Sequence, residues 1–169
     1  VLKNINLPLE IIPAEARANV PSDRGHELLE LVGLAGFGDK RPSELSGGMK
    51  QRASLCRALV HNPEVLILDE PFAALDAFTR EDLWLTMLRL REQEPFTGLL
   101  ITHDLREAIF LADEVIVLSA RPATNQYALN LSNFKIRTLD DLYTNEAMDI
   151  LNLLRGQIQQ ASEISLTER

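Results

Sequence analysis

The chain has 169 residues, of which 17 are basic and 25 acidic, so its formal net charge is -8 at neutral pH. This length allows one domain with a sizeable core and leaves little room for two. The acidic balance argues against direct nucleic-acid binding, which usually needs a basic surface. The single cysteine excludes an internal disulfide. No apolar run approaches the roughly 18 residues that a membrane span needs, so any link to a membrane should run through a partner.

The first part of the chain predicts helices separated by turns. The segment EARANV indicates a short helical turn, and Ser22 and Asp23 are plausible caps for a helix over RGHELLELVGL. The leucines of that helix form one apolar stripe, so it should pack on a neighbour. A second helix is predicted from Ser46 over SGGMKQRASLCRALVHN, and Asn62 with Pro63 should end it.

Between these two helices lies GLAGFGDK, which has the composition of a phosphate-binding loop. That loop requires Gly, four residues, then Gly-Lys-Ser/Thr. Here Asp39 follows Gly38 where the lysine should stand, and Lys40 comes one position late. The segment also follows an amphipathic helix instead of a strand. We therefore interpret it as a glycine-rich turn and not as a nucleotide site.

From residue 65 onward, short apolar runs alternate with helical patterns. The runs VLILDE, GLLITHD and EVIVLSA read as strands, with helices over about 77–93 and through LREAIFLAD between them. This alternation predicts an α/β domain with a parallel sheet, and the continuous apolar run VLIL is typical of a strand buried on both faces. After Pro122, YALNL could form an edge strand, and residues 139–160 look like an amphipathic terminal helix.

Polar side chains follow two of these strands. Asp69 and Glu70 end the first, and His103 lies at the end of the second. Ligand sites in parallel sheets lie at the carboxyl ends of strands. Asp69 suits a Mg²⁺ ion, Glu70 could orient or deprotonate a water, and His103 could contact a terminal phosphate. Taken singly, the two acids could equally cap the next turn, and His103 could be an ordinary loop residue.

The segment LSGGMKQR adds a possible anion site at a helix start. Ser46, Gly47 and Gly48 leave backbone N–H groups uncovered at the positive end of the helix dipole. The alternative is a plain helix cap with a flexible entry. Each pattern taken alone is therefore ambiguous.

The three motifs together resemble the ATPase subunit of ABC transporters. The chain carries LSGGMKQR, then VLILDEPFAALD, then ITHD, in that order. The resemblance implies the C-terminal part of a P-loop NTPase core with parallel strands, plus a helical signature subdomain. It implies a helical subdomain over 1–62, the C-terminal half of the catalytic core over 63–122, and a C-terminal strand and helix extension over 123–169.

The resemblance assigns several residues to ATP across a dimer interface. Ser46, Gly47 and Gly48 form the signature, which contacts the γ-phosphate bound to the opposite subunit, and Gln51 belongs to the same nucleotide-binding segment. Asp76 closes the D-loop, Ala-Leu-Asp, which crosses that interface.

The same resemblance assigns the chemistry. Asp69 is the Walker B aspartate for Mg²⁺, Glu70 is the catalytic base, and His103 is the switch histidine that senses the γ-phosphate. Phosphoryl transfer of this kind depends mainly on positioning and charge stabilisation.

Further residues narrow the resemblance to importers of the nitrate/sulfonate/taurine group. Met49, the segment DEPFAALDAFTRE, Trp84 and the segment ITHDLREAIFLADEVIVLSARP carry it, although glycine-betaine-type importers share part of this pattern. It implies a second ATPase subunit and membrane permease subunits as partners, and a substrate-binding protein indirectly, with no nucleic acid. The expected location is cytoplasmic, peripheral on the inner face of the plasma membrane.

The family's GxxGxGK[ST] phosphate loop and glutamine loop do not occur in these residues. We therefore expect an N-terminally truncated form of the subunit that exposes apolar surface, binds ATP weakly and does not hydrolyse it alone. Two alternatives stay open. One is a truncated, non-catalytic interaction module, and the other is a DNA-repair-type ABC ATPase, which the absence of coiled-coil heptads and the acidic charge disfavour.

Overall fold

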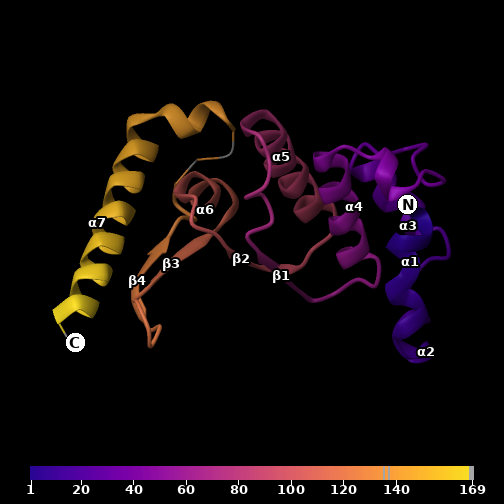
Figure 1. Cartoon of the computed structure of the whole chain (residues 1–169), viewed down its shortest axis with the longest axis horizontal. Coiled ribbons are helices and arrows are strands. Elements are labelled where there is room, and N and C mark those ends of the chain that lie inside the picture. The colour runs from indigo at the N-terminus through magenta and orange to yellow at the C-terminus, as the bar shows by residue number, and fades with distance from the viewer. Residues whose placement is uncertain (135, 137, 168–169) are drawn as a thin grey trace. The chain divides into compact units, whose positions relative to one another are not determined.

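The computed structural model describes residues 1–134, 136 and 138–167. It divides into two compact units, Val1–Ile101 and Thr102–Arg169, and each is described by itself (Figure 1). The three-part division expected from the sequence stays a prediction. No helix among the described residues is both long and apolar enough to cross a membrane.

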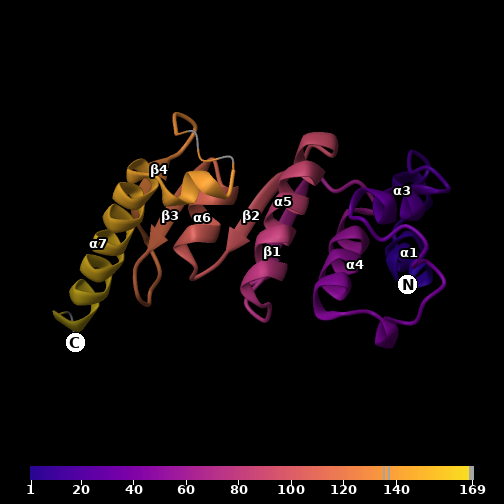
Figure 2. The same ribbon diagram turned by 90° about the horizontal axis from the view of Figure 1, so that it is seen from above.

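The first unit begins with a helical bundle. Helices α1 and α3 pack against α4, and the side chains between them are closed to solvent (Figures 1 and 2). Ile5 of α1, Leu28 of α3 and Cys56 of α4 are all fully buried. The elements are α1 (Leu2–Ile11), α2 (Ala14–Arg17), α3 (Arg24–Leu31), the 3-10 helix η1 (Pro42–Glu44) and α4 (Gly47–Leu59).

Helix α1 was not expected from the sequence. It contains Pro8, which has no N–H to donate and normally interrupts a helix. The burial of Ile5 against α4 outweighs this penalty. The chain turns between α3 and α4 at Gly33 and Gly36, whose φ angles are +71° and +79°. These are left-handed conformations that glycine adopts without steric cost, which agrees with the interpretation of GLAGFGDK as a turn.

The second part of this unit is a strand–helix–strand element, with β1 (Val65–Asp69), α5 (Ala77–Gln93) and β2 (Thr97–Ile101). The two strands pair in parallel, with Val65 opposite Thr97 and Asp69 opposite Ile101. This arrangement confirms the predicted α/β class.

The expectation that both faces of β1 are buried is wrong. Leu66 is 5% exposed, but Val65 and Ile67 on the opposite face are 56% and 64% exposed, beside Leu99 and Ile101 of β2 at 52% and 49%. Because side chains alternate along a strand, one face is covered and the other is open. The expected apolar surface is therefore present on the β1–β2 pair.

In the second unit the long helix α7 packs against α6 and against an antiparallel pair of strands. Ile109 and Phe110 of α6, Val117 of β3 and Leu154 of α7 lie in its core. The elements are α6 (Leu105–Leu111), β3 (Glu114–Leu118), β4 (Asn125–Asn130), the 3-10 helix η2 (Asp140–Tyr143) and α7 (Asn145–Thr167).

The partner of β3 differs from the expectation. The run EVIVLSA was expected to join the parallel sheet, but β3 pairs antiparallel with β4, with Val115 opposite Leu129. Only residues 119–124 connect the two strands. A parallel return needs a crossover of a dozen or more residues, whereas a short connection suits a hairpin. The expected edge strand YALNL is thus present, and it pairs with the run before it.

Candidate functional site

The helix start at Ser46 is a capped and accessible N-terminus. The Ser46 Oγ accepts a hydrogen bond from the Met49 N–H at 3.3 Å, so the side chain caps α4. Ser46 and Gly47 are exposed, whereas Gly48 is buried. The alternative interpretation of Ser46 as a helix cap is therefore correct. The cap leaves Ser46 and Gly47 exposed at the start of a 13-residue helix, and a helix N-terminus favours an anion.

Asp76 caps the neighbouring helix in the same way. Its Oδ1 accepts from the Thr79 N–H at 3.0 Å, and its Oδ2 accepts from the Thr79 hydroxyl at 2.7 Å. These hydrogen bonds, with that of the hydroxyl as the larger cause, lower the pKa of the Asp76 carboxyl below its ordinary value. Asp76 therefore holds the first turn of α5 as an anion at neutral pH.

The structure brings the starts of α4 and α5 together. A Cβ added to Gly48 would lie 2.4 Å from the Thr79 Cγ2, and one added to Gly47 would lie 3.9 Å from the Leu75 Cδ2. Figure 2 shows the two helices side by side. The predicted signature residues and the predicted D-loop thus form one surface of the first unit.

Two further residues of α4 complete this region. Gln51 is half-buried one turn into the helix, and its predicted contact with nucleotide stays a prediction. Arg52 was not singled out by the sequence, although it lies in LSGGMKQR. Its Nη1 donates to the Val32 carbonyl at 2.9 Å, and its Nη2 pairs with Asp82 of α5. Arg52 therefore ties α4 both to the turn after α3 and to α5.

Asp69 and Glu70 lie exposed at the carboxyl end of β1. The Glu70 backbone has φ +44°, a left-handed conformation that is costly for a residue with a side chain. Its N–H donates to the Ile101 carbonyl at 2.9 Å, which extends the pairing with β2 by one residue. The buried ring of Phe72 follows two residues later. The chain therefore bends sharply at Glu70 and presents two adjacent carboxylates at the strand end.

The residues around Asp69 indicate how the expected Mg²⁺ ion would be bound. Among the described residues, no group of three or more His, Cys, Asp or Glu side chains is placed to hold a metal. A Mg²⁺ ion commonly binds through one or two carboxylates together with water and substrate phosphates. An exposed carboxylate at a strand end fits that mode of binding and does not fit an all-protein metal cage. Asp69 is thus a possible ligand only in company with a nucleotide.

His103 belongs to the second unit, so its approach to Asp69 and Glu70 stays a prediction. Its neighbours in the chain are held by hydrogen bonds. The Thr102 hydroxyl donates to Glu107 Oε2 at 2.5 Å and accepts from the Asp104 N–H at 3.0 Å. Asp104 in turn caps α6, since its Oδ1 accepts from the Arg106 N–H at 2.9 Å. His103 is exposed and lies in a turn whose two flanking residues are held by hydrogen bonds.

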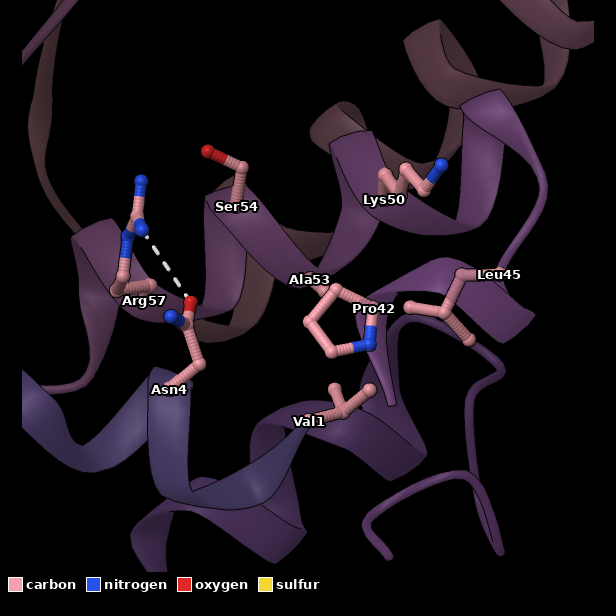
Figure 3. A pocket seen from close by; sticks show the side chains of 8 residues that line it. All are labelled: Val1, Asn4, Pro42, Leu45, Lys50, Ala53, Ser54 and Arg57. Carbon is pink, nitrogen blue, oxygen red and sulfur yellow. Dashed lines mark hydrogen bonds between the residues drawn. The ribbon is translucent and has the colours of Figure 1, made fainter. Parts of the chain in front are cut away.

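A cavity of about 150 Å³ lies elsewhere in the first unit, between the start of α1, η1 and α4 (Figure 3). Lys50 and Arg57 lie along one side of it, and the Arg57 Nη1 donates to Asn4 Oδ1 at 3.2 Å. None of the predicted nucleotide or catalytic residues lines it. Its lining residues are Val1, Asn4, Pro42, Leu45, Lys50, Ala53, Ser54 and Arg57.

Comparison with protein families gives a match to the family described as ABC transporter over residues 5–73. An uncharacterized ABC transporter ATP-binding protein of Methanocaldococcus jannaschii is 37% identical over 161 residues, which are 94% of this chain and 59% of that protein.

Two import proteins are more similar over a shorter stretch. An aliphatic sulfonates import ATP-binding protein of Pseudomonas savastanoi is 52% identical over 58% of this chain and 41% of its own length. A nitrate import ATP-binding protein of Synechococcus elongatus is 57% identical over 56% of this chain and 35% of its own length. The chain thus spans about half, or less, of the curated relatives that it matches.

A solved structure shares the fold. It is the dimeric, post-hydrolysis state of an ATP-binding cassette bound to ADP and Pi, and it matches with a TM-score of 0.58 and 29% identity. The match covers 79% of this chain and 57% of that one. The architecture described above is therefore that of roughly half of such a cassette.

Proposed function

We propose that this chain, which matches the ABC transporter family over residues 5–73 and an ABC transporter ATP-binding protein over 94% of its own length, forms part of a subunit that binds and hydrolyses ATP to drive import. The family binds ATP or ADP, and the related cassette is a dimer bound to ADP and Pi. The proposed partners are a second ATPase subunit and membrane permease subunits, and a substrate-binding protein indirectly.

The contact between the starts of α4 and α5 is the observation that carries the proposal. It brings the exposed residues Ser46 and Gly47 beside the Asp76 turn, in the unit whose strand β1 ends at Asp69 and is followed by Glu70. A helix N-terminus binds phosphate, and paired carboxylates serve a metal ion and a water. Both chemistries are needed for phosphoryl transfer.

Each residue has a distinct part in the proposed reaction. Asp69 would hold Mg²⁺, which neutralises phosphate charge when bound. Glu70 accepts a proton from the attacking water, and His103 donates a hydrogen bond to the terminal phosphate. Ser46 and the first N–H groups of α4, with Gln51 one turn on, bind phosphate presented by a partner subunit.

The import substrate is proposed from the relatives. Two of the relatives are named for the import of aliphatic sulfonates and of nitrate. We therefore propose a small oxyanion of the nitrate, sulfonate or taurine type as the transported compound. The proposed location is the cytoplasmic face of the membrane, where the permease holds the subunit.

The test uses the full-length gene product assembled with its permease. Glu70→Gln should lower the rate of phosphate release from MgATP by at least about a hundredfold and leave ATP binding in place. Glu64→Gln is the matched control, because it makes the same chemical change in an exposed residue just before the other end of β1. Equal rates in both variants would refute the role of Glu70, and absence of ATP turnover in the wild type would favour an interaction module.

The 169 residues by themselves should behave differently. They contain no phosphate loop, so they have no backbone cradle or lysine for the β- and γ-phosphates. We expect no phosphate release by this polypeptide above that of its Glu70→Gln variant. A rate of phosphate release above that of the variant would show that these 169 residues suffice for catalysis.

A further inference from the structure

The contact between Gly48 and Thr79 joins the segment LSGGMKQR to the turn at Asp76. We propose that Thr79 is a positioning residue, which fixes the start of α4 to the Asp76 turn so that the two move as one body. This inference rests on the proposed function, since it concerns how the phosphate-binding helix start is held. Neither residue was linked to the other by the sequence.

The polar half of Thr79 is fully engaged. Its hydroxyl donates to Asp76 Oδ2 at 2.7 Å while its N–H donates to Asp76 Oδ1 at 3.0 Å. The hydrogen bond of the hydroxyl holds the side chain in one rotamer, because rotation about χ1 would break it. The position of the methyl group is therefore determined by Asp76.

The methyl half of Thr79 faces Gly48. A Cβ on Gly48 would lie 2.4 Å from the Thr79 Cγ2 but 3.8 Å from the Thr79 Cβ, and the latter is an ordinary contact. The close approach thus depends on the methyl group alone. Because the hydrogen bonds hold that methyl group in place, Gly48 cannot shift toward α5 and only glycine fits there.

A second contact keeps the same two helices in register. Arg52 of α4 pairs with Asp82 of α5, four residues after Gly48 and three after Thr79. The contacts advance in the same direction along both helices, so α4 and α5 run parallel from adjacent starts. With Arg52 as the second point of attachment, α4 cannot pivot about the Thr79 contact.

The consequence is a mechanical link between two motifs of one chain. A phosphate bound at Ser46 and Gly47 restrains the first turn of α4, and Thr79 passes that restraint to the carboxylate of Asp76. Conversely, a partner that displaces Asp76 releases the rotamer of Thr79 and frees Gly48. The occupancy of one motif therefore sets the mobility of the other.

A rescue experiment tests the link in the full-length protein. Gly48→Ala should speed amide hydrogen exchange in residues 46–50 by about tenfold or more, because the new methyl group meets that of Thr79. Thr79→Ser removes the opposing methyl group and keeps the hydroxyl for Asp76. Gly48→Ala combined with Thr79→Ser should therefore return exchange to within about twofold of Thr79→Ser alone, helped by the better helix propensity of alanine.

Two further variants make the test specific. Gly47→Ala is the matched control, since its added carbon would meet only the Leu75 Cδ2 at 3.9 Å, and it should leave exchange in residues 46–50 nearly unchanged. Thr79→Val keeps the methyl shape and loses the hydroxyl, so exchange should rise at residues 77–80 by about threefold. Failure of Thr79→Ser to rescue Gly48→Ala would overturn the proposal.

The rate of ATP hydrolysis separates this proposal from the proposed function. If the link and the function both hold, Gly48→Ala lowers kcat and the double variant recovers it. If the exchange pattern appears as expected but the wild type hydrolyses no ATP, the link stands and the proposed function fails. If the wild type hydrolyses ATP and the exchange pattern is absent, the function stands and the link fails.

Discussion

The guanidinium group of Arg24 binds the carboxylate of Glu94 through two hydrogen bonds, from Nη1 to Oε1 at 2.8 Å and from Nη2 to Oε2 at 2.5 Å. Arg24 begins α3 and is 7% exposed, whereas Glu94 follows the last residue of α5. The pair thus ties the helical bundle to the strand–helix–strand element. Glu94, with a smaller contribution from Glu27, raises the pKa of Arg24 despite the opposing effect of burial, so the guanidinium group stays charged.

We expect Glu94→Ala to lower the free energy of unfolding by about 2–4 kcal/mol, because it leaves a buried cation without its main partner. This expected loss in the free energy of unfolding is at the low end for a buried ion pair, because the Glu94 side chain is 24% exposed. Glu92→Ala, at an exposed position two residues earlier, should cost less than about 0.5 kcal/mol. Denaturant unfolding of both variants measures the difference, and equal stabilities would show that the pair contributes nothing.

The helix starts could be predicted from the sequence, whereas the contacts between helices could not. Ser46 starts and caps α4 as expected, whereas Asp23 precedes α3 without a side-chain cap hydrogen bond, so local patterns indicate where a helix starts better than what caps it. The contact between Gly48 and Thr79 and the pair of Arg52 with Asp82 join residues about 30 positions apart. Nothing in the periodicity of either helix specifies which neighbour it will meet.

For the strands, too, the elements could be predicted from the sequence and their partners could not. The runs of β1, β2 and β3 were found because continuous apolar residues mark strands, but a run does not name its partner. The partner of β3 was decided by the short connection to β4, and the burial of β1 by what covers each face. Helix α1 contains Pro8, which disfavours a helix, and tertiary burial of Ile5 overrides that local preference.

Cys56 should be chemically inert in the folded protein. It is fully buried, its Sγ lies 3.4 Å from the Leu28 carbonyl, and burial raises its pKa to about 12 from an ordinary value of 9.0. The thiolate fraction at neutral pH is therefore about a thousandfold lower than in the unfolded chain. Iodoacetamide should label Cys56 at the rate of unfolding in native buffer and rapidly in denaturant.

The raised pKa of Cys56 also makes the stability of the folded protein depend on pH. The folded state holds the thiol proton more tightly than the unfolded state, so this contribution to stability is fully present below pH 9 and is lost as pH rises toward 12. Cys56→Ala should remove this alkaline sensitivity, as measured by denaturant unfolding from pH 8 to 11. An unchanged pH profile in that variant, or rapid labelling of the folded wild type, would contradict the assignment.

The Thr102 hydroxyl should be needed to hold the turn that carries His103. It donates to Glu107, which is 3% exposed, and it accepts from the Asp104 N–H. Thr102→Val removes the hydroxyl at nearly constant volume, so the buried carboxylate loses a donor and the free energy of unfolding should fall by about 1–3 kcal/mol. Thr102→Ser keeps the hydroxyl and should cost less than about 1 kcal/mol. Thermal unfolding of the two variants distinguishes a hydrogen-bonding role from simple packing, which would give the opposite order.

The left-handed backbone at Glu70 should be detectable as a cost in stability. With φ at +44°, any side chain at this position is strained, whereas glycine is not. Glu70→Gly and Glu70→Ala remove the same carboxylate, so interactions of the side chain cancel in the comparison. The glycine variant should be more stable than the alanine variant by about 1 kcal/mol, although glycine ordinarily destabilises an ordered position.

Both variants should abolish ATP hydrolysis by the full-length protein to the same degree, because each lacks the carboxylate. Equal stabilities, or a more stable alanine variant, would mean that the backbone at residue 70 is relaxed. The same pair of substitutions at Asp69, the last residue of β1, should give the opposite order, since glycine weakens a strand. Opposite signs of the stability difference between the glycine and alanine variants at Asp69 and Glu70 would therefore place the bend at Glu70.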